Sequence, residues 1–177
     1  KNRNYRFVLT NNNKIEMFDS RGKKVSGFKP NTFESIIIKS PVHIRIDGKD
    51  FIIVQLENGE LKILDRRGRD RINIEEQIQF SKNSFYSYMK TFTTTDRQGY
   101  LVQIDLDGKL SKKNLNITSD NLIDIKNDNL VYISENILSI KGININLPFG
   151  RYSQPKIFNE SSRMLIGISD FSENNIY

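Results

Sequence analysis

The stretch ELKILDRRGRD, residues 60–70, decides the fold. Its apolar residues largely alternate with polar ones, as in a strand with one buried face, and the run ends in Asp65, two arginines and Gly68. An aspartate can accept hydrogen bonds from backbone N–H groups two residues further on, and glycine adopts the left-handed conformation that a tight turn needs. The stretch therefore predicts a strand that ends in an Asp-x-x-Gly turn.

The same pattern recurs along the chain. Without a gap, Asp19 and Gly22 align with Asp65 and Gly68 at an offset of 46 residues. A third copy repeats the turn 40 residues later, and a weaker fourth copy keeps the apolar alternation and the glycine but lacks the aspartate. Such self-similarity indicates a repeat architecture. The copies span residues 7–25, 53–71, 100–110 and 135–145.

Each repeat contains enough short strands for one small sheet. Asn58-Gly59 lies between two alternating apolar runs, which is a strong signal for a β-hairpin. Four antiparallel strands in a unit of this length are typical of a β-propeller blade. We therefore expect an all-β fold, a β-propeller segment of about four four-stranded antiparallel blades that is part of a larger ring. The strands of the clearest unit are predicted at 42–46, 50–56, 60–65 and 70–74.

The ends of the chain predict an excerpt of a longer ring. Residues 5–10 and 163–169 fall at the same position within a blade, so joining the two ends would place one strand too many in the ring. Residues 1–177 are therefore expected to form a single propeller segment. Its blades are predicted at about 1–30 (partial), 34–75, 77–117, 119–148 and 151–177 (partial).

The repeats GKDFIIVQLENGELKILDRRG (48–68) and YRFVLTNNNKIEMFDSRGKKVSGF (5–28) resemble blades of the quinoprotein-like (PQQ-like) β-propeller superfamily. This resemblance implies a protein of the bacterial cell envelope, periplasmic or associated with the outer membrane. Enzymatic members of the family carry a tryptophan docking motif, whereas this chain has no tryptophan. The resemblance therefore implies a non-catalytic scaffold without a quinone cofactor.

Composition narrows the functional classes. The 177 residues carry a formal net charge of +6, with the excess dispersed along the chain, so no nucleic-acid partner is expected. The chain has no cysteine, which excludes disulfides, thiol nucleophiles and cysteine-based metal sites. It also lacks an apolar run long enough for a membrane-spanning helix.

Several candidate sites have simpler structural interpretations. The segments 47–50 and 105–108 supply too few oxygens for a calcium loop and are expected to be turns. His43, the only histidine, has no adjacent pattern that would supply a nucleophile. An aromatic group resembles a stacking surface for bases or sugars, but core packing is the preferred interpretation. It comprises Phe85, Tyr86, Tyr88, Phe92 and Tyr100, interspersed with Lys82, Lys90 and Arg97.

We therefore predict a non-enzymatic platform for protein–protein interaction, without metal or cofactor, whose partners are other envelope proteins. If equivalent turns lie on one face, their basic residues form a rim that an acidic partner could contact. The predicted partner-binding residues are Arg66, Arg67, Arg69, Arg71, Arg21, Lys23 and Lys24.

Two alternatives remain open at this stage. One is an enzyme or ligand-binding propeller with its site in an axial channel, lined by residues 41–46 and 121–126. The polar residues of these segments that could contribute are His43, Arg45, Asp124 and Lys126. The other is a cytosolic propeller hub, which the missing tryptophan and the missing Gly-His to Trp-Asp signature argue against.

Overall fold

The computed structural model describes residues 5–30, 32–160, 163–172 and 175–176. The chain divides into two compact units, one of residues 1–79 and 105–110 and one of residues 80–104 and 111–177. Within the described ranges, all helices and strands that could be assigned are strands, and no helix is found. The predicted all-β class is therefore confirmed.

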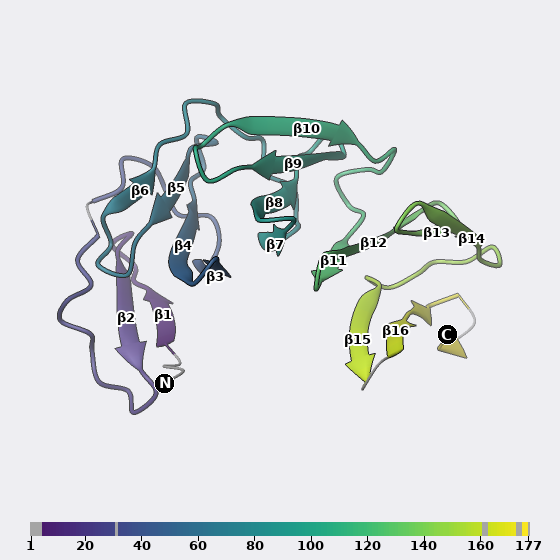
Figure 1. The fold of residues 1–177 in the computed structure, drawn as a ribbon, viewed down its shortest axis with the longest axis horizontal. Helices are drawn as coiled ribbons and strands as arrows, with labels where there is room; N and C mark the ends of the chain where they lie inside the picture. The colour runs from purple at the N-terminus through teal and green to yellow at the C-terminus, as the bar shows by residue number, and fades with distance from the viewer. Residues whose placement is uncertain (1–4, 31, 161–162, 173–174, 177) are drawn as a thin grey trace. The chain divides into compact units, whose positions relative to one another are not determined.

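Three sheets each contain four antiparallel strands that follow one another in sequence, so the chain runs through each sheet as a simple meander (Figure 1). This is the arrangement predicted for one repeat. The first sheet contains β3 (Val42–Ile46), β4 (Lys49–Gln55), β5 (Leu61–Leu64) and β6 (Asp70–Ile72). The second contains β7 (Tyr86–Tyr88), β8 (Thr91–Thr95), β9 (Tyr100–Ile104) and β10 (Leu110–Asn114). The third contains β11 (Ile123–Lys126), β12 (Asn129–Ser134), β13 (Ile137–Ile140) and β14 (Ile143–Asn146).

Smaller sheets lie before and after these three in sequence. β1 (Tyr5–Leu9) pairs with β2 (Ile15–Asp19), β15 (Lys156–Glu160) with β16 (Arg163–Gly167), and β17 (Ser169–Asp170) with β18 (Asn175–Ile176). Most predicted strands lie within one or two residues of their observed bounds. The strand predicted at 70–74 is shorter and ends at Ile72, and its pairing with β5 shifts register between Ile63 and Leu64.

The Asp-x-x-Gly turn has the geometry predicted from the sequence. Asp65 Oδ1 accepts the N–H groups of Arg67 at 2.7 Å and Arg69 at 3.1 Å, while the Gly68 N–H donates to the Asp65 carbonyl at 2.9 Å. The same three hydrogen bonds recur around Asp19, Asp96 and Asp105. One carboxylate thus satisfies two backbone donors that would otherwise be unpaired in each turn.

Neighbouring sheets within each unit bury their apolar faces against one another. In the first unit, Ile15 and Met17 on β2 belong to one core cluster with Ile52 and Val54 on β4. In the second unit, strands β12 and β13 share a cluster with Ile157 and Ile168. Burial of these side chains is the main favourable contribution to stability, at about 25 cal/mol for each Å² of apolar surface.

A buried amide also joins two sheets of the second unit. Asn83 is 2% exposed, and its Nδ2 donates to Thr95 Oγ1 at 2.7 Å and to the Asn121 carbonyl at 2.9 Å. Its Oδ1 accepts the Ile123 N–H at 2.9 Å. Asn83 precedes β7 and Ile123 begins β11, so this side chain ties the first strands of two successive sheets together through backbone groups.

Gly99 is required for close approach as well as for its positive φ. An added Cβ would lie 1.9 Å from the Ile117 carbonyl oxygen, whereas Gly142, with a similar φ, has open space around it. We expect Gly142→Ala to cost about 1–2 kcal/mol of unfolding free energy, the cost of the left-handed conformation. Gly99→Ala should cost about 1–3 kcal/mol more, because the Ile117 backbone must move. Urea unfolding checks this, and equal losses would contradict it.

The first turn of each four-stranded sheet has two residues with positive φ: Asp47-Gly48, Met89-Lys90 and Asn127-Asp128. These are the conformations of a type I′ turn, which favours asparagine and glycine. Met89 has φ 48° and is 61% exposed, so its side chain gains little from burial. We expect Met89→Asn to raise the unfolding free energy by about 0.5–1 kcal/mol, measured by urea unfolding. A loss of stability would show that Met89 makes a contribution beyond its backbone conformation.

Candidate protein-interaction surface

The basic residues predicted on the first turn are exposed, and two of them are paired. The guanidinium of Arg21 lies 3.4 Å from the Asp19 carboxylate, and Lys24 forms an ion pair with Glu16. Lys23 donates its backbone N–H to Asp19. Among the three basic side chains of this turn, only that of Lys23 forms no ion pair with the residues that the structure describes.

On the second turn, Arg69 is held by the carboxylate that shapes the turn. Its Nε and Nη2 lie 2.9 Å and 2.7 Å from Asp65 Oδ2. Burial raises the pKa of Asp65, but the Arg69 side chain and the backbone N–H groups of Arg69 and Arg67 together lower the pKa below its ordinary value. Arg69 is thus largely neutralised, and its main role is structural.

Arg66 belongs to a cluster that the sequence alone did not reveal, which we call the Asp50 cluster (His43, Arg45, Asp50, Arg66 and Arg71). Asp50 Oδ1 lies 3.1 Å from Arg45 Nη1 and 3.0 Å from His43 Nε2, and Asp50 Oδ2 lies 3.6 Å from Arg66 Nε. The side chain of Asp50 is 13% exposed, whereas those of Arg45 and Arg66 are 61% and 73% exposed. A nearly buried carboxylate thus positions two exposed guanidinium groups.

Arg71 completes this cluster through a different contact. Its guanidinium carbon lies 4.7 Å from the centre of the Phe51 ring, and Nη1 donates to the Asp50 carbonyl at 3.3 Å. Stacking on an aromatic face leaves most of the guanidinium donors available. Three guanidinium groups therefore gather at Asp50, two at its carboxylate and one at its backbone carbonyl.

His43 has a hydrogen-bonded carboxylate, as a histidine general base often has, but the rest of the arrangement differs from a catalytic site. Arg45 binds the same oxygen of Asp50 as His43 does. In a Ser-His-Asp triad, the carboxylate that orients the imidazole acts together with a nucleophile held on the other ring nitrogen. The contacts found here are those of an ion-pair network in which His43 is a peripheral member.

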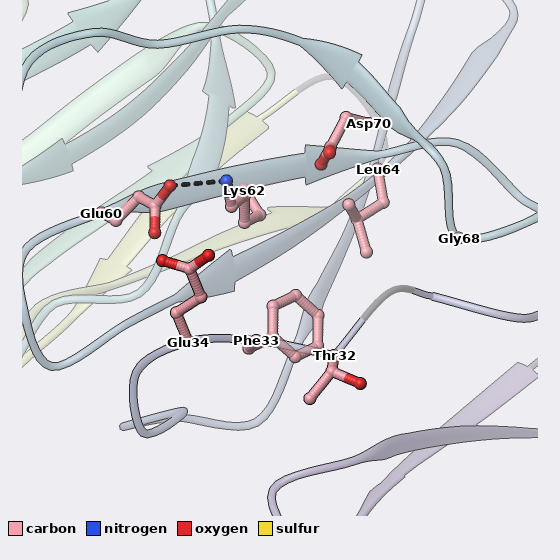
Figure 2. Close-up of a pocket in the computed structure, with 8 residues that line it drawn as sticks. All are labelled: Thr32, Phe33, Glu34, Glu60, Lys62, Leu64, Gly68 and Asp70. Carbon is pink, nitrogen blue, oxygen red and sulfur yellow. Dashed lines mark ion pairs between the residues drawn. The ribbon is translucent and has the colours of Figure 1, made fainter.

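A pocket of about 220 Å³ lies beside the Asp65 turn, whose Gly68 is one of its lining residues. Glu60 and Lys62, two residues apart in the chain, form an ion pair of 2.5 Å on its wall, and the Glu34 carboxylate points toward this pair (Figure 2). The Glu60 hydrogen bond raises the pKa of Lys62, and the nearby charges of Asp70 and Glu34 raise it further. Pockets for cofactors and drug-sized ligands usually measure about 300–1,000 Å³, so this one is small for such a ligand. The remaining lining residues are Thr32, Phe33, Leu64 and Gly68.

Three of the four polar residues predicted to line an axial channel are used in other contacts, and the fourth, Lys126, is exposed. His43 and Arg45 belong to the Asp50 cluster in the first unit. In the second unit, Asp124 Oδ2 accepts the Ile157 N–H at 2.8 Å and Asp124 Oδ1 lies 3.7 Å from Lys156 Nζ. Asp124 therefore joins β11 to β15 rather than standing free as a catalytic acid.

The two segments considered as calcium loops are turns. Asp47 and Gly48 form the two-residue connection between β3 and β4, and the Asp105 carboxylate accepts two backbone N–H groups at 2.9 Å. Across the described ranges, no group of three or more acidic or histidine side chains could hold a metal ion. A helix long and apolar enough to cross a membrane is likewise absent from these ranges.

The aromatic group of residues 85–100 contributes mainly to packing. Phe85 and Phe92 are 3% and 0% exposed. Tyr86 is partly buried, its hydroxyl donates to the Ile123 carbonyl at 3.1 Å, and burial raises the pKa of that hydroxyl. These side chains do not form the exposed stacking surface that base or sugar recognition requires.

Comparisons with known proteins show a similarity of fold without assigning a family. No protein-family model and no curated protein matches the chain. Among solved structures, the computationally designed Ika8 protein matches with a TM-score of 0.54 and 11% identity, over 96% of this chain and 59% of that chain. The computationally designed Ika4 protein has a TM-score of 0.54 and 13% identity, over 80% of this chain and 84% of that chain. At these identities the similarity concerns the fold alone, so the family resemblance stays a prediction.

The structure thus brings Arg66 and Arg71 together and adds His43, Arg45 and Asp50 to them. Part of this cluster could have been found in the sequence. A two-residue turn at Asp47-Gly48 places Arg45 opposite Asp50, and the structure has this register. Opposite charges at directly paired positions are a recognisable stabilising contact between strands.

The ion pair of Asp65 makes its contribution to stability depend on pH. We expect Asp65→Asn to cost about 1 kcal/mol of unfolding free energy at pH 7, because the amide still accepts the backbone N–H groups but loses the charge that binds Arg69. The folded pKa lies below the unfolded value of about 3.9, so this stabilisation is present above that pH and is lost as pH falls through the folded pKa. Urea unfolding should therefore show a smaller difference in unfolding free energy between the wild type and Asp65→Asn at pH 3 than at pH 7.

Asp105 supplies the matched control for this substitution. Its carboxylate binds the backbone N–H groups of Asp107 and Lys109, and it takes part in no ion pair among the described residues. Asp105→Asn should change the unfolding free energy by less than about 0.5 kcal/mol at either pH. Equal effects of the two substitutions would mean that the turn itself, and not the Arg69 pair, dominates.

Proposed function

We propose that this protein is a non-catalytic platform for protein–protein interaction, built as a β-propeller segment and contacting an acidic surface of its partner. The observation that carries the proposal is the Asp50 cluster, in which two guanidinium groups lie against one carboxylate and a third binds the backbone carbonyl of the same residue. Four-stranded meander sheets, which follow one another as propeller blades do, support the architectural part.

The geometry of the Asp50 cluster suits it to a carboxylate ligand. Each guanidinium has five N–H donors, and Asp50 engages only one atom each of Arg45 and Arg66 within 3.6 Å. The remaining donors are available to an incoming anion in the planar arrangement that matches a carboxylate. Asp50 also restricts the side chains before a partner arrives, which lowers the entropy cost of binding.

The rigidity of the sheets favours recognition over turnover. Buried strands and Asp-centred turns hold the exposed arginines on a fixed frame, as expected where specificity resides in surface loops. The cellular setting rests on the sequence alone. The resemblance of the repeats to quinoprotein-like blades supports a place among bacterial envelope proteins, in the periplasm or at the outer membrane.

The proposal is tested by capturing the protein from native membranes with its partners and quantifying them by mass spectrometry. In a variant with Arg45→Gln, Arg66→Gln and Arg71→Gln, we expect a stoichiometric partner present with the wild type to be lost. The control variant carries Lys109→Gln, Lys113→Gln and Lys126→Gln, which removes the same charge from three exposed positions of other turns and strands. This control should retain the partner.

Circular dichroism spectra of both variants should match the wild type, so that loss of binding is not loss of folding. Equal retention by all three proteins would overturn the role of the Asp50 cluster. Isolation of the protein alone, with a bound small molecule or hydrolytic activity, would instead favour a ligand-binding or enzymatic propeller.

A further inference from the structure

Beside β2 lies a groove of about 620 Å³, formed between that strand and the segment that follows it. Its volume falls within the range of about 300–1,000 Å³ that ligand sites usually have. The groove belongs to the first unit, and the Asp50 cluster does not line it. We call it the β2 groove.

The floor of the β2 groove is apolar. It includes Ile15, Val25 and Phe28, of which Ile15 and Phe28 are 4% and 6% exposed and belong to the core of the first unit. The Phe28 ring packs against Phe7 with 5.9 Å between ring centres. Apolar side chains of a ligand would therefore rest on a rigid and well-packed surface.

The rim of the groove is basic. Lys14, Lys24 and Lys29 line it together with a single carboxylate, that of Glu16, which already pairs with Lys24. Lys14 and Lys29 are exposed, and their ammonium groups form no ion pair with the described residues. A ligand with carboxylates flanking its apolar groups would thus meet complementary charge on the rim.

Hydrogen bonds hold the far wall of the groove at both of its ends. The Val25 N–H donates to the Met17 carbonyl at 2.7 Å, and the Lys29 N–H donates to the Arg67 carbonyl at 2.8 Å. The second bond connects this wall to the Asp65 turn. The groove is therefore preformed, and it lies between the two basic turns of the first unit.

We propose that the β2 groove binds an extended, acidic segment of the partner protein, with apolar side chains on Ile15, Val25 and Phe28 and carboxylates at Lys14 and Lys29. This inference rests on the proposed function and specifies the partner's chemistry: a peptide in which apolar residues alternate with Asp or Glu. An extended chain suits this pattern because its successive side chains point to opposite sides.

The test uses a fluorescently labelled octapeptide in which glutamate alternates with phenylalanine or leucine, titrated with the purified protein by fluorescence anisotropy. We expect binding to the wild type and a loss of more than about tenfold in affinity with Lys14→Glu and Lys29→Glu. The control variant, Lys113→Glu and Lys126→Glu, has the same net charge and should stay within about twofold of the wild type. A peptide with glutamine in place of glutamate should bind about tenfold more weakly.

No binding to the wild type at about 1 mM protein, or equal losses in both double variants, would overturn the inference. The experiments distinguish failure of the groove inference from failure of the proposed function. If capture of the membrane partner still depends on Arg45, Arg66 and Arg71 while the octapeptide does not bind, the platform stands and the groove does not. If the octapeptide binds as expected while no partner is captured, the groove stands and the proposed function does not.

Discussion

From β2 to β10 the fold depends on one interaction, the acceptance of two backbone N–H groups by an aspartate at the end of a strand. At Asp19, Asp65, Asp96 and Asp105 the same oxygen satisfies donors two and four residues further on. Because these turns reverse the chain within a few residues, β6, β9 and β10 each pair with the strand before them in sequence. The third four-stranded sheet has the same meander with other turns, which contain positive-φ residues at 127–128, 135 and 141–142, and burial between sheets stabilises the arrangement.

The same acidic residues determine which basic side chains can face a partner. Asp65 binds Arg69 with two hydrogen bonds and removes it from the set of available charges. Asp50, at the start of β4, does the opposite, since it gathers Arg45 and Arg66 without using up their donors. The difference is one of number and geometry. Arg69 gives two hydrogen bonds to one oxygen of a carboxylate that it does not share, whereas Arg45 and Arg66 share the Asp50 carboxylate, which leaves a surplus of positive charge.

The turns, the strands and the repeat could be predicted from the sequence because they follow from short-range chemistry. Asp65, Gly68 and the Asn58-Gly59 hairpin each act within a few residues of their own position. The cross-strand pair of Arg45 and Asp50 was also within reach through the two-residue turn between them. The approach of Arg66 to Asp50 could not be predicted from the sequence, because it depends on the register between β4 and β5 and on side-chain rotamers. One wall of the β2 groove is formed largely by residues 26–30, which lie beyond the aligned copies of the repeat and have no alternating pattern.

The buried amide of Asn83 bears on how such repeats can diverge. Two of its partners in the next sheet are the carbonyl of Asn121 and the N–H of Ile123, which are groups that the backbone supplies whatever the side chains are. Asp124 contacts the following sheet in the same manner, through the N–H of Ile157. After duplication, the repeat that supplies only backbone groups could therefore change its side chains without losing the junction. The one polar side chain in the preceding repeat must be retained. Duplication and drift would then preserve the architecture while erasing the resemblance between units, as the weak similarity of residues 135–145 to the earlier copies illustrates.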